Sequence, residues 1–330
     1  MNNLDIKIFV SHRIDLDSKV LDNPLFIPVR CGAVFDKRKN ISMLGDDTGD
    51  NISEKRMSFN ELTVLYWAWK NQKADYYGLC HYRRFFNFTG SQGLENEPVT
   101  IYNAGATVVD CLNEETISTF KLQDEDIIRK NIEGYDALVV KPVDFSHTDL
   151  KHNYEAMEKF PSYHKIKDVD LTLKIIKEKY PHMYSTVERY MFGVRYNRLY
   201  NCFVLKADVF NEFCSWFFDI LFELEKQMDM TGYTIEQFRT PGTIGERLFG
   251  IWVLWMQENN YKINEVSVLF VNNTENIKNK YSVYFDYYKT KLIYNLYFGK
   301  NKNYYRLKKE ALKQKIKFIK KQERNNNDKK

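Results

Sequence analysis

The spacing of apolar residues switches repeatedly between two patterns along the chain, and this switching predicts an α/β protein. Short apolar runs, which are typical of strands buried on both faces, lie at 6–12, 24–34, 76–80, 136–142, 200–205 and 266–271. Apolar residues at helical spacing predict helices near 61–73, 124–132, 149–159, 168–180, 207–228 and 242–257. Strands that alternate with helices favour a single mixed sheet flanked by helices. Residues 87–120 contain several Gly and Pro breakers and are expected to be irregular.

The strand predicted at 76–80 is followed directly by a group of cationic residues. His81, Arg83 and Arg84 stand at its carboxyl end, which is where open α/β sheets bind their ligands. Guanidinium groups are suited to a bidentate grip on phosphate. We therefore interpret Arg83 and Arg84 as candidate phosphate ligands, with a solvated basic turn as the alternative.

Two predicted helix starts carry acidic residues. Ser58 and Glu61 have the spacing of a capping box, so a helix is expected to begin at Ser58. Glu246 is expected in the first turn of a later helix, after a Gly-rich entry at 239–245 that permits the close approach of another group. A carboxylate there is favoured by the helix dipole. We interpret Glu246 as a candidate general base; the alternative is that it only stabilises its helix or pairs with Arg239.

The chain lacks the sequence patterns of several common enzyme classes. The six histidines are scattered without the spacing of metal ligands, and no P-loop, GxGxxG or GxSxG is present. This weakens kinase, dehydrogenase and α/β-hydrolase interpretations. The loop at 45–53 contains Asp46, Asp47 and Asp50, and such carboxylates suit a hard cation, but we prefer a self-capping turn. Asp50 and Asn51 remain candidate ligand contacts, and neither a metal nor a cofactor is predicted.

Charge divides the chain into two parts. Residues 300–330 hold 13 Lys and Arg against 3 Asp and Glu, which leaves a net charge of −5 on residues 1–299. The predicted domains are therefore a catalytic body at 1–275 and a basic, Tyr- and Lys-rich helical extension at 276–330. Five cysteines without a CxxC pair indicate reduced thiols, and no signal peptide is visible at the N-terminus. These features predict a cytoplasmic protein.

Five segments together resemble a known bacterial family. They are KIFVSHR at 7–13, GDDTGDNIS at 45–53, ELTVLYWAWKN at 61–71, DYYGLCHYRRFF at 75–86 and RTPGTIGERL at 239–248. The family consists of cytoplasmic glycosyltransferase-type proteins encoded in capsular and O-antigen polysaccharide loci, and some members are galactofuranosyltransferases. The resemblance covers residues 5–275. Cys202 stands where the family pattern has Met, which is a conservative change in packing.

The resemblance implies a GT-A-like, Rossmann-type fold and an inverting transfer of galactofuranose from UDP-galactofuranose to a lipid-linked glycan. Such enzymes usually hold a metal at an Asp-x-Asp motif, where this chain has His81-Tyr82-Arg83-Arg84 instead. Arg83 and Arg84 would then neutralise the diphosphate. Glu246 is the expected base, with Asp136 or Asp144 as alternatives. The remaining expected donor or acceptor contacts are Ser11, His12, Asp50, Asn51, His81, Asn201, Arg239 and Arg247.

The basic extension suggests where such an enzyme would act. Tyr305, Leu312, Ile316 and Ile319 fall on one side of a predicted helix with lysines on the other faces, as in helices that lie on anionic membranes. Residues 300–330 are thus expected to hold the protein peripherally on the inner face of the cell membrane. The rival interpretation is a non-catalytic glycan- or nucleic-acid-binding protein. Because the basic charge is confined to the extension, we predict no nucleic acid partner.

Overall fold

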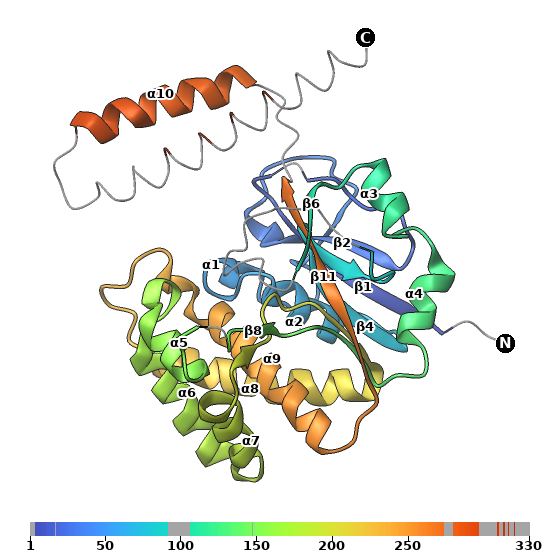
Figure 1. Ribbon diagram of the computed structural model, residues 1–330, viewed down its shortest axis with the longest axis vertical. Helices are drawn as coiled ribbons and strands as arrows, with labels where there is room; N and C mark the ends of the chain where they lie inside the picture. The colour runs from blue at the N-terminus through green and yellow to red at the C-terminus, as the bar shows by residue number, and fades with distance from the viewer. Residues whose placement is uncertain are drawn as a thin grey trace. The chain divides into compact units, whose positions relative to one another are not determined.

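The computed structural model of the protein (Figure 1) describes residues 4–16, 18–91, 106–146, 148–273 and 280–296, with single positions at 309, 313, 316 and 320. The chain divides into two units, residues 1–274 and residues 275–330. The second unit contains helix α10 (Lys280–Leu296). Among the described residues, no helix has both the length and the apolar character needed to cross a membrane.

The strands of the first unit are β1 (Ile6–Arg13), β2 (Phe26–Cys31), β3 (Leu44–Gly45), β4 (Tyr76–His81), β5 (Arg84–Asn87), β6 (Thr107–Cys111), β7 (Ala137–Val140), β8 (Val143–Asp144), β9 (Tyr196–Asn197), β10 (Phe203–Lys206) and β11 (Ile263–Asn273). Its helices are α1 (Arg56–Phe59), α2 (Leu62–Asn71), α3 (Glu114–Thr119), α4 (Glu125–Ile132), α5 (Asn153–Lys159), α6 (Ile166–Lys179), α7 (Tyr184–Glu188), α8 (Ala207–Gln227) and α9 (Thr240–Glu258), with a π-helical turn at Arg189–Gly193.

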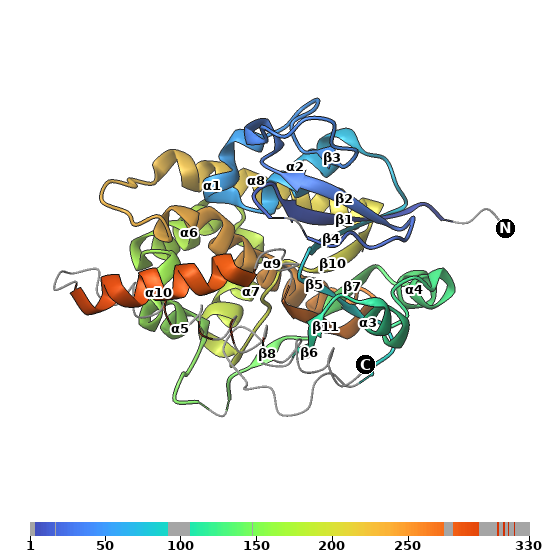
Figure 2. The same ribbon diagram turned by 90° about the horizontal axis from the view of Figure 1, so that it is seen from above.

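Nine of the strands in the described ranges form one mixed sheet, as the sequence predicts. Strands β3, β2, β1 and β4 run parallel in that order, and Figure 2 shows β2, β1, β4 and β10 side by side. Pairing then forks at β4. Residues 76–79 of β4 pair antiparallel with β10, whereas His81 pairs with Arg84 of β5 across a tight turn. Strand β11 joins the two branches, because it pairs with both β5 and β7.

The core lies on both faces of the sheet. Phe9 of β1 points into one cluster that includes α2, α6, α8 and α9. Its neighbours Ile8 and Val10 point into a second cluster with α3 and α4, because successive side chains of a strand face opposite sides. The views in Figures 1 and 2 accordingly place α3 and α4 on one side of the sheet and α5, α6 and α7 on the other. This confirms the predicted sheet flanked by helices.

Two predicted boundaries are wrong for a local reason. Ser58 does not begin a long helix: it lies inside the short helix α1, and α1 and α2 are separated at Asn60, whose φ is +51°. Asparagine tolerates this left-handed backbone better than most residues. Glu61 is therefore the N-cap residue of α2, not the partner in a capping box. The region 87–120, predicted to be irregular, contains β6 and α3 among its described residues.

The strand predicted at 200–205 begins late. Tyr200 and Asn201 precede β10 and have φ values of +88° and +43°, so neither adopts an extended backbone. Phe203, the first residue of β10, pairs with Leu79 of β4. Continued in the same register, Asn201 would stand opposite His81, where β5 takes over the pairing. The fork in the sheet thus places the Tyr200–Asn201 turn beside the β4–β5 turn.

Candidate functional site

The candidate site lies at the edge of the sheet where β1 and β4 end. Ser11 and His81 are register partners on these two strands, and both precede the cationic residues that follow. Ser11 and His12 are buried, with 3% and 2% of their surface exposed. The Ser11 carbonyl accepts a hydrogen bond from the Tyr82 amide at 3.1 Å, which ties the end of β1 to the β4–β5 turn. The two strands therefore present one continuous edge.

Positive charges crowd this edge. We call Arg13, Arg83 and Arg84, with His12 and His81, the cationic cluster. Burial holds the pKa of His81 well below its usual range, and the charges of Arg84 and Arg83 lower it further. Burial lowers the pKa of His12 to about 4. Both imidazoles are consequently neutral at pH 7. Arg13 is paired with the Asp15 carboxylate, so Arg83 and Arg84 supply the positive charge of the site.

Several donors of the cationic cluster have no partner among the described residues. The His81 Nδ1, Arg83 Nε and Arg84 Nε atoms are buried and unbonded, and in the part of the chain that the structure describes neither Arg83 nor Arg84 forms a salt bridge. The Arg84 guanidinium lies 5.1 Å from the centre of the Tyr200 ring. Buried polar groups are nearly always hydrogen-bonded, so these unsatisfied donors at a strand edge, two of them cationic, have the chemistry to bind an anion.

Two carboxylates lie beside the cationic cluster and are held by adjacent residues. The Tyr200 amide donates to Glu246 Oε1 at 3.1 Å, and Asn201 Nδ2 donates to Glu61 Oε1 at 2.9 Å. Burial raises the pKa of Glu246, Arg247 and Arg84 oppose this change, and the Glu61 charge adds to it. Glu246 and Glu61 are therefore close enough to repel each other, and Arg84 is close enough to attract Glu246.

Glycines of α9 bring these carboxylates together. A Cβ at Gly242 would lie 2.3 Å from Asn60 Nδ2, and one at Gly245 would lie 2.8 Å from Leu62 Cδ1. Asn60 and Leu62 flank Glu61, so the small residues let α9 approach the α1–α2 junction closely. The Gly-rich stretch expected as the entry to this helix is part of α9 itself, because the helix begins at Thr240, two residues before the predicted start at 242. Glu246 thus lies in the second turn, and its predicted place in the first turn is wrong.

The remaining predicted site residues are distributed unevenly. Arg239 is exposed, donates from Nε to Asn60 Oδ1 at 3.0 Å and is close enough to Arg83 to lower the pKa of that guanidinium. Arg247 Nη1 donates to Asn197 Oδ1 at 2.8 Å. His12 Nδ1 lies 2.7 Å from Ser18 Oγ. Arg239 therefore borders the cationic cluster, Arg247 borders Glu246, and His12 belongs to the cluster itself.

Asp50 and Asn51 lie elsewhere. Asp50 accepts a hydrogen bond from the Tyr66 hydroxyl, and Asn71 contacts its backbone at the far end of α2. Glu61 stands at the other end of this 10-residue helix, a distance of about 15 Å. Asn51 caps its own loop through Gly49 and Ser53. The structure therefore does not bring Asp50 and Asn51 to the cationic cluster.

The acidic loop and the alternative bases have structural roles. Asp46 is fully buried and accepts hydrogen bonds from the Gly32 and Ala33 amides and the Ser53 and Thr63 hydroxyls. Among the described residues, no group of three metal-ligating side chains is present. Asp136 accepts from the Lys262 amide at the amino end of β7, which is the opposite edge of the sheet. Asp144 caps Ser146.

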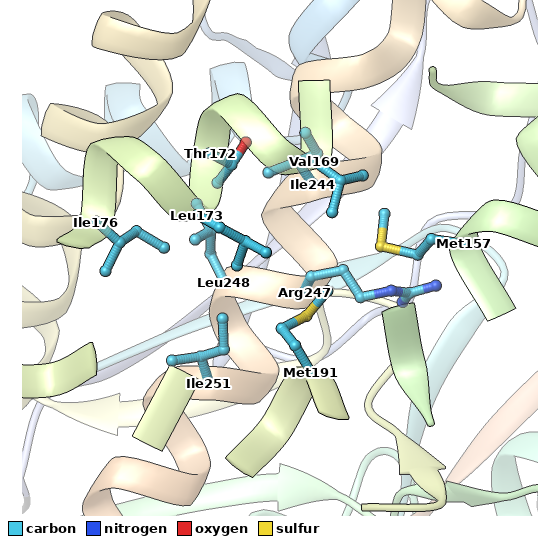
Figure 3. A pocket seen from close by; sticks show the side chains of 10 residues that line it. All are labelled: Met157, Val169, Thr172, Leu173, Ile176, Met191, Ile244, Arg247, Leu248 and Ile251. Atoms are coloured by element: carbon cyan, nitrogen blue, oxygen red, sulfur yellow. The ribbon is translucent and has the colours of Figure 1, made fainter. Parts of the chain in front are cut away.

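A small apolar pocket lies next to the site but is not part of it. Figure 3 shows Arg247 extending across this pocket toward Met157, with residues of α6 and α9 around it. The pocket encloses roughly 10 Å³, which is room for about one water molecule. It cannot receive a sugar or a nucleotide, so the strand edge remains the candidate site.

Comparisons with known proteins give the family of the chain and a similar solved structure. The model of a family described as "Domain of unknown function (DUF4422)" matches residues 7–260. The solved apo structure of the bifunctional glycosyltransferase WbbM is similar to the chain, with a TM-score of 0.73 and 32% sequence identity. The similarity covers 82% of this chain and 46% of WbbM, so the chain spans about half the length of that protein. No curated protein matches the chain.

Proposed function

Since this chain belongs to the DUF4422 family, we propose that it is a glycosyltransferase that moves a sugar from a nucleotide-diphospho-sugar to a glycan acceptor. The observation behind the proposal is the juxtaposition, within the described residues, of unpartnered buried donors of Arg83 and Arg84 with the half-buried carboxylate of Glu246, whose pKa is raised. A diphosphate leaving group needs cationic donors that stabilise its negative charge. An attacking hydroxyl needs a carboxylate that accepts its proton. The likeness to WbbM, a bifunctional glycosyltransferase, supports the same class of reaction.

In the proposed reaction, the cationic cluster stabilises the leaving group. As the bond between the anomeric carbon and the diphosphate oxygen breaks, negative charge develops on the diphosphate, and preorganised donors stabilise that charge strongly. Arg83 and Arg84 would contact it from the β4–β5 turn, with His81 as a neutral donor beside them. We propose that these guanidinium groups take the place of a divalent metal, so transfer should proceed in the presence of EDTA.

Glu246 would act on the acceptor. The acceptor hydroxyl attacks the anomeric carbon from the face opposite the diphosphate, which inverts the configuration, and Glu246 takes the hydroxyl proton. The raised pKa of Glu246 makes it a better proton acceptor than an exposed carboxylate. Its Oε1 is fixed by the Tyr200 amide, which orients the carboxylate for this transfer.

We propose UDP-galactofuranose as donor and a lipid-linked glycan of a capsular or cell-surface polysaccharide as acceptor, because of the family resemblance carried by residues 5–275. Residues 1–275 would hold the catalytic activity, and residues 276–330 would attach the enzyme peripherally to the cytoplasmic face of an anionic membrane. Helix α10 supports this role. Phe285, Tyr288, Leu292 and Leu296 are each at least 60% exposed and follow helical spacing, as in an interfacial helix. The residues from Lys300 onward lie outside the described part except for single positions.

The test measures UDP release when the protein is mixed with UDP-sugars and lipid-linked acceptors, and NMR of the product reports the anomeric configuration. Glu246→Gln keeps the shape and the hydrogen bond from Tyr200 but removes the basicity, so kcat should fall at least ~100-fold while donor binding is retained. Glu258→Gln makes the same change at the other end of α9 and should leave transfer unaffected. Sugar binding without turnover in the wild-type protein would favour the non-catalytic alternative.

A further inference from the structure

Glu61 belongs to the site although neither its sequence context nor the resemblance gives it a role there. It is the N-cap residue of α2, but its side chain makes no capping hydrogen bond to that helix. Instead Oε1 accepts from Asn201 Nδ2 at 2.9 Å across 140 residues of sequence. Its carboxylate is therefore directed at the Tyr200–Asn201 turn rather than at its own helix.

The Tyr200–Asn201 turn has an unfavourable backbone conformation that contacts with other residues must stabilise. Both residues have positive φ values and are nearly inaccessible, at 3% and 2% exposure. A non-glycine residue in such a region is strained and persists only where the surroundings fix it, typically at functional sites. The contacts that fix this turn include the Glu61 and Glu246 hydrogen bonds and the Arg84 guanidinium against the Tyr200 ring.

We propose that Glu61 is a positioning residue for the transfer reaction: it fixes Asn201 and, through the strained turn, aims the Tyr200 amide that orients Glu246. This inference rests on the proposed function, since it gives Glu246 the role of base. The groups that face Glu246 are Arg84 from β5, Arg247 from α9, Glu61 from the start of α2 and Tyr200 before β10. Of these groups, Glu61 is negatively charged, so it repels the deprotonated carboxylate of Glu246.

The two functions of Glu61, its hydrogen bond and its charge, are separable. Glu61→Gln retains a carbonyl that accepts from Asn201 and removes the charge. The base must be deprotonated to act, so loss of the repelling charge lowers the pKa of Glu246 and moves the acidic limb of the kcat–pH profile to lower pH, by about half a unit to one unit. A residue that only stabilises the start of α2 would change the melting temperature and leave this limb in place.

Exchange of the two partners tests the hydrogen bond. Asn201→Asp places a second carboxylate against that of Glu61 and should lower kcat by about 10- to 100-fold. The KM for the sugar donor should change little. Asn201→Asp combined with Glu61→Gln restores a hydrogen bond in which the introduced glutamine amide donates, and the double variant should regain at least about tenfold of that loss. The matched control for the charge change is Glu125→Gln on α4, which should affect neither parameter.

The outcomes separate this inference from the proposed function. An unshifted pH limb in Glu61→Gln, or a double variant no better than Asn201→Asp alone, would overturn the role of Glu61 while transfer by the wild-type protein stands. If the wild-type protein transfers no sugar, the proposed function fails. The titration of the Glu246 carboxyl carbon by NMR then still reports on the coupling: a lower pKa in Glu61→Gln supports it, and an unchanged pKa refutes it.

Discussion

Replacement of Arg83 by glutamine should stabilise the free protein and weaken its binding of a diphosphate. Burial lowers the pKa of Arg83, and the charges of Arg84, Arg13 and Arg239 add to this effect. A group whose charged form is disfavoured in the fold destabilises that fold as long as the charge is kept, and an arginine keeps it at any ordinary pH. Arg83→Gln removes this cost when no ligand is bound.

The magnitudes follow from the crowding of charge. Like charges in one cluster repel by on the order of 2 kcal/mol at an effective dielectric constant near 20, and solvent screening leaves roughly 1 kcal/mol. For a body of this size, that corresponds to a rise of about 2–4 °C in melting temperature. Saturation with UDP at about 100 times its Kd stabilises the wild-type protein by about 2.7 kcal/mol. Loss of one charge-assisted hydrogen bond of about 1.5–3 kcal/mol should weaken UDP binding by about 10- to 150-fold.

The assay is thermal denaturation with and without UDP, together with calorimetric titration of UDP at two salt concentrations. The control is Arg198→Gln. Arg198 is also a buried arginine, at 3% exposure, but its guanidinium donates to the Val140 carbonyl and pairs with Glu265. That variant should melt at a lower temperature and bind UDP normally. If Arg83→Gln instead melts at a lower temperature and keeps the UDP-induced rise, Arg83 is a structural residue and the assignment of the cationic cluster is wrong.

Three further outcomes are expected. Transfer should persist in EDTA; complete loss of activity that manganese or magnesium restores would show that a metal, and not the arginine pair, neutralises the diphosphate. Gly250→Ala should cost about 1–3 kcal/mol or more in chemical denaturation, because its Cβ would lie 1.9 Å from the buried Tyr190 hydroxyl, whereas Gly193→Ala, whose nearest neighbour is at 3.5 Å, should be tolerated. Truncation after Gly299 should weaken binding to anionic vesicles in a salt-dependent way and leave the melting temperature of the catalytic body unchanged; undiminished vesicle binding would contradict the role given to residues 300–330.

The elements predicted well are those whose own residues determine them. The apolar runs of β1 and β4 and the periodicity of α8 are local patterns, and the first turn of α4 carries the acidic residues typical of a helix start. The structure likewise brings Arg84 and Glu246 close together. The strand end before Arg83 and Arg84 was visible in the sequence, whereas the start of the helix that carries Glu246 was predicted two residues late. Such features are fixed within a short stretch of chain.

The features that sequence reasoning missed depend on distant partners. Tyr200 and Asn201 have the composition of a strand, and their contacts with Glu246 and Glu61 hold them at positive φ. Glu61 was expected to cap a helix, and the break at Asn60 that frees its side chain is a weak local signal. Asp50 belongs to a conspicuous acidic loop, yet that loop is tied to the far end of α2. Proximity in sequence to a motif did not predict proximity in space.

The glycines of α9 have a consequence for how the protein folds. Gly242, Gly245 and Gly250 each cost about 0.5–1 kcal/mol relative to alanine in a helix, so the half of α9 that carries Glu246 is a poor helix on its own. It becomes helical only against the α1–α2 junction and Tyr190, which are its packing partners. We therefore expect this segment to order late during folding and to exchange its amide protons early in native-state hydrogen exchange. A folding intermediate that has formed its sheet but has not docked α9 would contain most of the secondary structure. It would still lack Glu246, the proposed base, in its place at the site.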